Sequence, residues 1–170
     1  MRWALSVSVC ALMVGGAHAD PTLVTIYGPL LEQCYLEADG SEAKIQCIGA
    51  LSQSCMAEED GGETTLGISL CLSSEAEVWD VFLNEEYQKS MSWAKSADQE
   101  DQEYFPEFAN RASALRDAQR AWIAFRDAEC SLAYAAWGAG SMRHIAGNDC
   151  IMTLTAKRAI EVRNIREFLQ

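Results

Sequence analysis

Basic residues, histidines and prolines are all scarce in this chain. Its 170 residues include 13 lysines and arginines against 25 aspartates and glutamates, with only two histidines and three prolines. The imbalance is uneven, because residues 20–110 hold 19 acids and three bases whereas residues 111–170 hold six acids and nine bases. Such charge repels nucleic acid and anionic lipid and favours a cationic partner. The alternative is that an acidic surface only keeps the protein soluble.

Signals for β-strands are also nearly absent. No run alternates valine, isoleucine, threonine and aromatic residues with polar ones, and no Asn-Gly pair marks a hairpin. Apolar residues recur instead at helical spacings of three and four. We expect short helices over about 29–38 and 41–55, then three long ones: from Thr64 or Thr65 to about Ala97, up to about Trp137, and from a cap at Asn148 or Asp149. This predicts an all-α fold, an antiparallel bundle of three main helices plus an N-terminal helical hairpin.

The long helices carry apolar stripes that should face the core. The stripes of the first two are Trp79, Phe82, Leu83, Tyr87, Met91 and Ala94, and then Leu115, Ala118, Trp122, Phe125 and Leu132. Trp122 and Phe125 could stack on a ligand, but their shared face favours core packing. Arg126 and Asp127 lie close to this face and are expected to pair with residues such as Arg158 or Asp117 at its edge. This indicates a structural ion pair rather than catalysis, because a half-buried arginine needs a carboxylate partner.

The first 19 residues have the pattern of an export signal. Arg2 precedes an almost uncharged apolar stretch, and Ala17-His18-Ala19 supplies small residues at a cleavage point. The stretch is shorter than the roughly 20 residues that a membrane helix needs. Lipid attachment at Cys10 is disfavoured, because bulky Val9 precedes it. The sequence therefore predicts a periplasmic or secreted protein that begins at Asp20, with no membrane contact after processing.

Six cysteines remain after the predicted leader is removed, an even number that favours three disulfides in an exported protein. Zinc is disfavoured because the chain has no C-x-x-C pair and the processed chain keeps only His144. We expect neither a metal nor another cofactor. Six cysteines allow about 15 pairings, which sequence alone does not separate. Glycine-containing turns between neighbouring cysteines favour the pairs Cys34–Cys47, Cys55–Cys71 and Cys130–Cys150.

The segment from Gly138 to Gly147 is expected to be a loop whose ends the Cys130–Cys150 disulfide holds. Ser141, Arg143 and His144 in this loop are our candidate binding residues, because polar side chains on loops of a rigid scaffold often carry recognition. The alternative is a solvated connection. A nucleophile–base pair would need an activated serine or cysteine beside His144, and Ser141 lacks that context. We therefore predict a protein that is not an enzyme.

The string from Leu115 to Cys130, LRDAQRAWIAFRDAEC, closely resembles the signature of the LprI-like lysozyme-inhibitor domain family. The similarity extends upstream and downstream, over about residues 55–170. The residues that we assign to its structural motif are Leu83, Asn84, Tyr87, Gln119, Trp122, Phe125, Arg126, Asp127 and Arg158.

The resemblance implies a small exported helical domain with cysteine-bridged helices, and it supports two of the three cysteine pairs. The founding member of the family is described as a lysozyme inhibitor, whereas most relatives have no assigned activity. This chain departs from the family by lacking the lipid-attachment cysteine and by an extra segment that contains Cys34 and Cys47. We divide it into a leader (1–19), an N-terminal extension (20–54) and the LprI-like domain (55–170).

The leading hypothesis is an exported binding protein with a protein partner, in its sharpest form an inhibitor of a cationic, lysozyme-type muramidase. Removing the leader with Arg2 leaves 12 bases and 25 acids, a net charge of −13, which would speed association with a basic enzyme. The alternative is a structural or interaction module of the cell envelope with an unrelated protein partner. A third hypothesis, a small hydrolase, requires His144 to be hydrogen-bonded to a serine or a carboxylate in a concave pocket.

Overall fold

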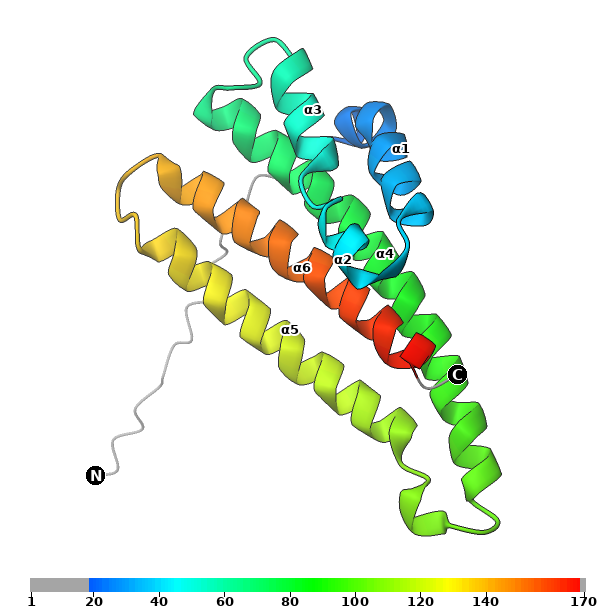
Figure 1. Cartoon of the computed structure of the whole chain (residues 1–170). Coiled ribbons are helices and arrows are strands. Elements are labelled where there is room, and N and C mark those ends of the chain that lie inside the picture. The colour runs from blue at the N-terminus through cyan, green and yellow to red at the C-terminus, as the bar shows by residue number, and fades with distance from the viewer. Residues whose placement is uncertain (1–18, 169–170) are drawn as a thin grey trace, which may run out of the picture.

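A computed structural model describes residues 19–168, so most of the predicted leader lies outside the described residues (Figure 1). The described part is helical and contains no strand, which confirms the predicted all-α fold. None of its helices is long and apolar enough to cross a membrane. The helices in chain order are α1 (Pro21–Glu37), α2 (Gly40–Ile45), α3 (Ala50–Glu58), α4 (Thr65–Asp101), the short 3-10 helix η1 (Pro106–Phe108), α5 (Arg111–Ala135) and α6 (Met142–Phe168).

Helices α4, α5 and α6 form the predicted three-helix bundle. The Thr64 hydroxyl accepts a hydrogen bond from the Gly67 amide and caps α4, as its sequence position predicted. Near the other end of α4, the Asp98 carboxylate accepts from the amides of Arg111 and Ala112 at 2.8 and 2.9 Å and so caps α5. The chain therefore runs down α4, up α5 and down α6 (Figure 1).

The N-terminal helices cover α4 and α6 on the other side, where α1 and α3 pack against α4 and α2 packs against α6. The expected helix boundaries here were wrong. Helix α1 begins at Pro21, where proline favours the first turn and the Asp20 side chain caps the Thr22 amide, so Pro29 lies inside the helix. The expected helix over 41–55 is divided into α2 and α3, because Gly49 has a φ of +99° between them.

A buried carboxylate holds the start of α3. Glu75 of α4 is fully buried, and it accepts hydrogen bonds from the Gly49 amide at 2.6 Å, the Ser52 amide at 2.7 Å and the Trp79 indole at 2.9 Å. The first amides of a helix lack partners within the helix and carry partial positive charge, so a carboxylate stabilises them. This contact explains why the chain can turn at Gly49 inside the core.

The three disulfides are the nearest-neighbour pairs that the turns favoured. Cys34–Cys47, Cys55–Cys71 and Cys130–Cys150 have Cα separations of 5.8, 5.7 and 5.4 Å. Cys55–Cys71 joins α3 to α4 and Cys130–Cys150 joins α5 to α6, whereas Cys34–Cys47 joins α1 to the turn between α2 and α3. The disulfides therefore hold the fold close to its turns.

The hydrophobic core lies between α4, α6 and the N-terminal helices, and α5 contributes little to it. On α4, Trp79 and Leu83 are buried as their stripe predicted. On α5 only Cys130 is buried, whereas Phe125 is 55% and Leu132 is 63% exposed. The expectation that Ala118, Phe125 and Leu132 face the core was therefore wrong. Helix α5 lies at the edge of the bundle, and no other helix of residues 19–168 lies outside it (Figure 1).

Candidate binding surface

Four of the predicted motif residues meet where α5 packs on α6. The guanidinium groups of Arg126 and Arg158 lie over the Trp122 ring, at 5.2 and 5.8 Å from its centre. Arg158 is buried and donates a hydrogen bond to Gln119 at 3.0 Å. Stacking of arginine on an aromatic face is attractive, so this cluster attaches α5 to α6 despite the small apolar contact.

The other motif residues have separate places. Arg126 donates from two nitrogens to Asp127 at 3.0 and 2.9 Å, so these two neighbours on α5 pair with each other rather than with the expected Arg158 or Asp117. Leu83 is buried in the core and Tyr87 packs against it. Asn84 is exposed and donates to Asp80 of the same helix at 2.8 Å. Part of the motif thus serves the packing of the long helices, whereas Asn84, Phe125 and Asp127 are exposed.

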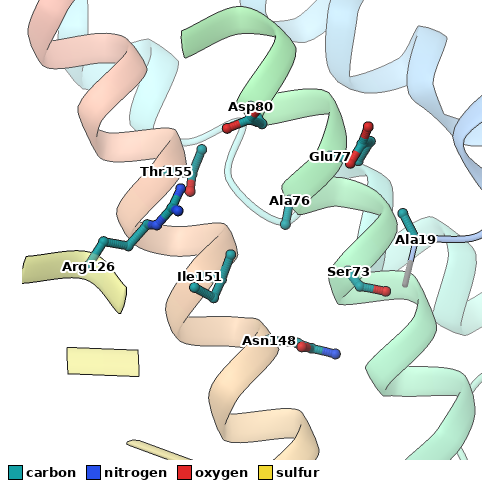
Figure 2. A pocket seen from close by; sticks show the side chains of 9 residues that line it. All are labelled: Ala19, Ser73, Ala76, Glu77, Asp80, Arg126, Asn148, Ile151 and Thr155. Atoms are coloured by element: carbon teal, nitrogen blue, oxygen red, sulfur yellow. The ribbon is translucent and has the colours of Figure 1, made fainter. Parts of the chain in front are cut away.

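A hollow of about 260 Å³ opens beside the cluster, between α4, α5 and α6. Figure 2 shows Glu77 and Asp80 on α4, Arg126 reaching in from α5, and Thr155 on α6. The Thr155 side chain is buried, and its hydroxyl has no hydrogen-bond partner within the described part of the chain. Carboxylates on one wall and a guanidinium on the other give this hollow a polar character.

The α5–α6 connection is shorter than expected. It spans residues 136–141, because α6 begins at Met142 rather than at Asn148 or Asp149. Gly138 takes a φ of +51° where the chain leaves α5, and the Gly140 amide donates to the Trp137 carbonyl at 2.9 Å. Arg143 and His144 therefore belong to the first turn of α6, and of the three candidate binding residues only Ser141 lies in the loop.

Arg143 and His144 turn back toward α5 instead of projecting from the loop. The Arg143 guanidinium lies over the Tyr134 ring at 5.4 Å and donates to the Gly138 carbonyl at 3.4 Å. The His144 ring meets the same tyrosine edge to face at 5.3 Å. Ser141 is exposed, and Trp137 beside it is 51% exposed. The accessible part of the connection is therefore its tip, from Trp137 to Ser141.

His144 lines a second hollow, of about 360 Å³, with Tyr134, Ser131 and Asp127 of α5. Its hydrogen bond there joins its ring to the Arg143 guanidinium at 3.5 Å. A guanidinium neighbour does not activate a nucleophile, which needs a base held beside it. Within residues 19–168 no group of three or more histidine, cysteine, aspartate and glutamate side chains is placed to hold a metal ion.

The connection between α3 and α4, residues 59–64, lies at the same end of the bundle. Asn148 of α6 donates to the Ser69 carbonyl of α4 at 3.0 Å, and Ser90 of α4 donates to the Val162 carbonyl of α6 at 3.1 Å, so the two helices run parallel. The start of α6 is therefore level with the start of α4 (Figure 1). We call the two connections, 59–64 and 136–141, the loop end of the bundle.

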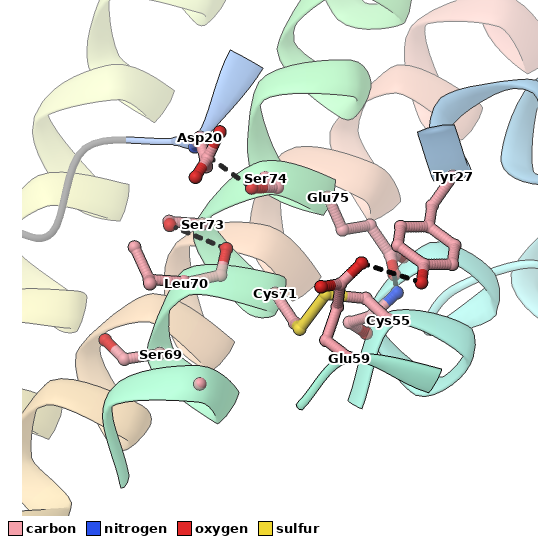
Figure 3. Close-up of a disulfide and its surroundings, with 12 residues drawn as sticks. Asp20, Tyr27, Cys55, Glu59, Ser69, Leu70, Cys71, Ser73, Ser74 and Glu75 are labelled. Atoms are coloured by element: carbon pink, nitrogen blue, oxygen red, sulfur yellow. Dashed lines mark hydrogen bonds between the residues drawn. A yellow bond between two sulfur atoms is a disulfide. The ribbon is translucent and has the colours of Figure 1, made fainter. Parts of the chain in front are cut away.

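The connection 59–64, the acidic one of the two, is held by a disulfide and a hydrogen bond. The Cys55–Cys71 disulfide closes it, and the Tyr27 hydroxyl donates to the Glu59 carboxylate at 2.9 Å (Figure 3). Burial and the Glu59 carboxylate raise the pKa of Tyr27, so its hydroxyl stays protonated as the donor. Glu58, Asp60 and Glu63 remain exposed. The loop end thus presents acidic side chains and an exposed tryptophan on a frame closed by two disulfides.

Trp137 and Leu66 are surface residues that sequence reasoning did not select. Leu66 is 66% exposed and lies in the first turn of α4, directly after the connection 59–64. Trp137 was treated only as the end of a helix.

Comparisons with known proteins confirm the family that the sequence motif indicated. The model of the family described as "Lysozyme inhibitor LprI" matches residues 55–162. An uncharacterized protein of Rhizobium meliloti (strain 1021) is 30% identical over 102 residues, which cover 60% of this chain and 73% of that protein. No solved structure matches the chain.

Proposed function

Because the chain belongs to the lysozyme inhibitor LprI family, we propose that it is an exported, non-enzymatic binding protein whose partner is another protein. The family is one of inhibitor domains rather than of enzymes. Three disulfides support a role outside the cytoplasm, because disulfides persist in oxidising compartments. The finer proposal is that the partner is a cationic, lysozyme-type muramidase.

The loop end is the observation that carries this finer proposal. It presents the exposed carboxylates of Asp60 and Glu63, with exposed Glu58 at the adjoining end of α3, and an exposed tryptophan, Trp137, at the same end of a rigid bundle. Tryptophan is enriched among the residues that dominate binding energy, and complementary charge around it speeds encounter with a basic protein. The net charge of −13 after leader removal adds to the same attraction.

Inhibition would follow from occlusion of the substrate cleft. Muramidases act with two carboxyl groups in a cleft that binds sugar, so a rigid tip that enters the cleft blocks access without any chemistry. The tip from Trp137 to Ser141 is held at its base by the Cys130–Cys150 disulfide. A tip ordered before binding loses less conformational entropy when it docks. Arg143, which lies against Tyr134, acts in this proposal by supporting the tip and not by entering the cleft.

The test is lysis of bacterial cell walls by a cationic lysozyme, with increasing amounts of the processed protein at low salt. We expect slower lysis at micromolar protein and a weaker effect at high salt, since salt screens the exposed charges. Trp137→Ala should weaken inhibition at least tenfold, in the range of a hot-spot residue. Tyr104→Ala is the matched control, because Tyr104 is 71% exposed beyond the opposite end of α4.

Lysis that stays unchanged at micromolar protein contradicts the muramidase version. The chain would then act as an envelope interaction module, which predicts that an envelope protein co-purifies with it. Equal inhibition by wild type and Trp137→Ala would instead leave the inhibitor function standing and contradict the assignment of the loop end.

A further inference from the structure

The hollow between α4, α5 and α6 has an unsatisfied polar group in its wall. Thr155 of α6 is 1% exposed, and its hydroxyl has no hydrogen-bond partner within residues 19–168. A threonine hydroxyl inside a helix can donate to a carbonyl of the preceding turn, but that of Thr155 does not. Figure 2 shows its oxygen pointing toward the Arg126 guanidinium. Since a buried hydroxyl without a partner is costly, this position favours a ligand that supplies one.

The walls of this hollow, which we call the polar hollow, carry opposite charges. On α4, Glu77 and Asp80 are three residues apart, so they share a face of the helix, and both are exposed. On α5, the Arg126 side chain is 19% exposed. Asp127 accepts from its Nε and Nη2, but a guanidinium has more N–H groups than these two bonds use. Donors therefore remain for a ligand opposite the carboxylates.

A second, mainly apolar hollow adjoins the polar one. Asn148 and Ile151 of α6 line both of them. The second hollow, of about 360 Å³, extends along α5 past the Cys130–Cys150 disulfide to the Tyr134 ring. An apolar lining with a few convergent polar groups is typical of sites for small molecules. The two hollows together have this character, with the charged groups at one end.

We propose that the two hollows bind a small zwitterion, an amino acid with an apolar side chain. Its ammonium group lies against Glu77 and Asp80. Its carboxylate accepts from the Arg126 guanidinium and from the Thr155 hydroxyl, which thereby gains its missing partner. Its side chain lies in the second hollow, toward Tyr134.

The charges and the size select this class of ligand. The two carboxylates repel a simple anion such as phosphate, and the guanidinium repels a simple cation, whereas a zwitterion satisfies both walls. The polar hollow, at about 260 Å³, is smaller than the roughly 300–1,000 Å³ of sites for drug-sized ligands, which suits the charged end of an amino acid. This site does not depend on the proposed function, because it lies beside the helices and not at the loop end.

Ala19, the last residue of the predicted leader, also lines the polar hollow. Removal of the leader would therefore widen its entrance. The Asp20 nitrogen, which would become the terminal ammonium, lies 3.2 Å from the Ser74 hydroxyl, and neither of these residues lines the hollow. The processed protein is thus the form to test.

Isothermal titration calorimetry of the processed protein with L-phenylalanine tests the proposal. We expect saturable binding of one ligand per chain. N-acetyl-L-phenylalanine lacks the ammonium and L-phenylalanine amide lacks the carboxylate, so each should bind about tenfold more weakly or worse. Glycine, which lacks the apolar group, should also bind more weakly. An acetylated or amidated probe that binds as tightly as L-phenylalanine overturns the assignment of the charged walls.

Variants locate the site in the chain. Thr155→Val and Asp80→Asn should each weaken the binding of L-phenylalanine by about tenfold or more. Arg126→Gln should do the same, and Arg126→Lys should retain part of the affinity because it keeps the charge. Glu85→Gln is the matched control, since Glu85 is an exposed acid of α4 that lines neither hollow. Circular dichroism and urea denaturation check that each variant is folded.

A wild type that binds none of these probes at millimolar concentration overturns the proposal. So does binding that Thr155→Val and Asp80→Asn leave unchanged, or that Glu85→Gln weakens as strongly. The titration contains no lysozyme, so a failure here is distinguishable from a failure of the proposed function.

Discussion

Replacement of Glu75 should be costly for stability, and the structure allows the size of the loss to be worked out. Its carboxylate, fully buried, serves the amides of Gly49 and Ser52 and the indole of Trp79. Glu75→Gln keeps the volume but turns one oxygen into a donor. One carboxylate oxygen accepts from the Ser52 amide, and the other accepts from both the Gly49 amide and the Trp79 indole. The new side-chain amide can keep its oxygen toward Gly49 and Trp79, so that one donor, the Ser52 amide, loses its acceptor.

A buried donor without an acceptor costs about 1–3 kcal/mol. We therefore expect Glu75→Gln to lower the free energy of unfolding by about 2 kcal/mol. Glu75→Ala strands three donors and leaves a cavity, so we expect a loss of more than about 4 kcal/mol. Urea denaturation followed by circular dichroism, with the disulfides intact, measures both. Glu77→Gln is the control, because Glu77 is exposed on the same helix and should change stability by less than about 0.5 kcal/mol. A Glu75→Gln variant as stable as this control would refute the assigned role of the carboxylate.

Three further outcomes are expected. Removing the Cys130–Cys150 disulfide by two serines should lower the free energy of unfolding by about 3 kcal/mol, as a closed loop of 20 residues predicts, and should raise amide hydrogen exchange at the end of α5. Thr155→Val should raise the unfolding free energy by about 1 kcal/mol in the same urea assay, because it removes a buried hydroxyl without a partner; a loss of stability would contradict this. Desolvation raises the pKa of Asp98, but the amides of Ala112 and Arg111 and the Arg111 guanidinium lower it by more, so the folded pKa lies below the ordinary value. The stabilisation from Asp98 is therefore present above the unfolded pKa and is lost as the pH falls through the folded pKa. Asp98→Asn should flatten this part of an acid titration of the unfolding free energy.

The features that the sequence predicted correctly depend on local spacing. Thr64 caps α4 because its hydroxyl needs only the amide three residues later. The cysteine pairs follow from turns that lie between neighbouring cysteines, and the stripe with Trp79 and Leu83 is buried because both lie on one face of a long helix. Each of these depends on contacts that are close in sequence or on a single helical period.

The features that were missed depend on distant contacts. The break at Gly49 is stabilised by Glu75, which lies 26 residues away, so the local signal for one helix over 41–55 was misleading. The start of α6 at Met142 was hidden by a glycine-rich segment that reads as loop. Phe125 lies only three residues from Trp122, yet it faces solvent, because α5 has one neighbouring layer and not two. Periodicity shows that a face is apolar but does not show what covers it.

Cell-wall lysis by a cationic lysozyme, titrated with the processed protein at low salt, tests the proposed function most directly. We expect lysis to slow with increasing protein until the enzyme is saturated. Trp137→Ala should weaken this effect at least tenfold, and Tyr104→Ala should leave it unchanged. An unchanged rate of lysis at micromolar protein would contradict inhibition of this class of enzyme.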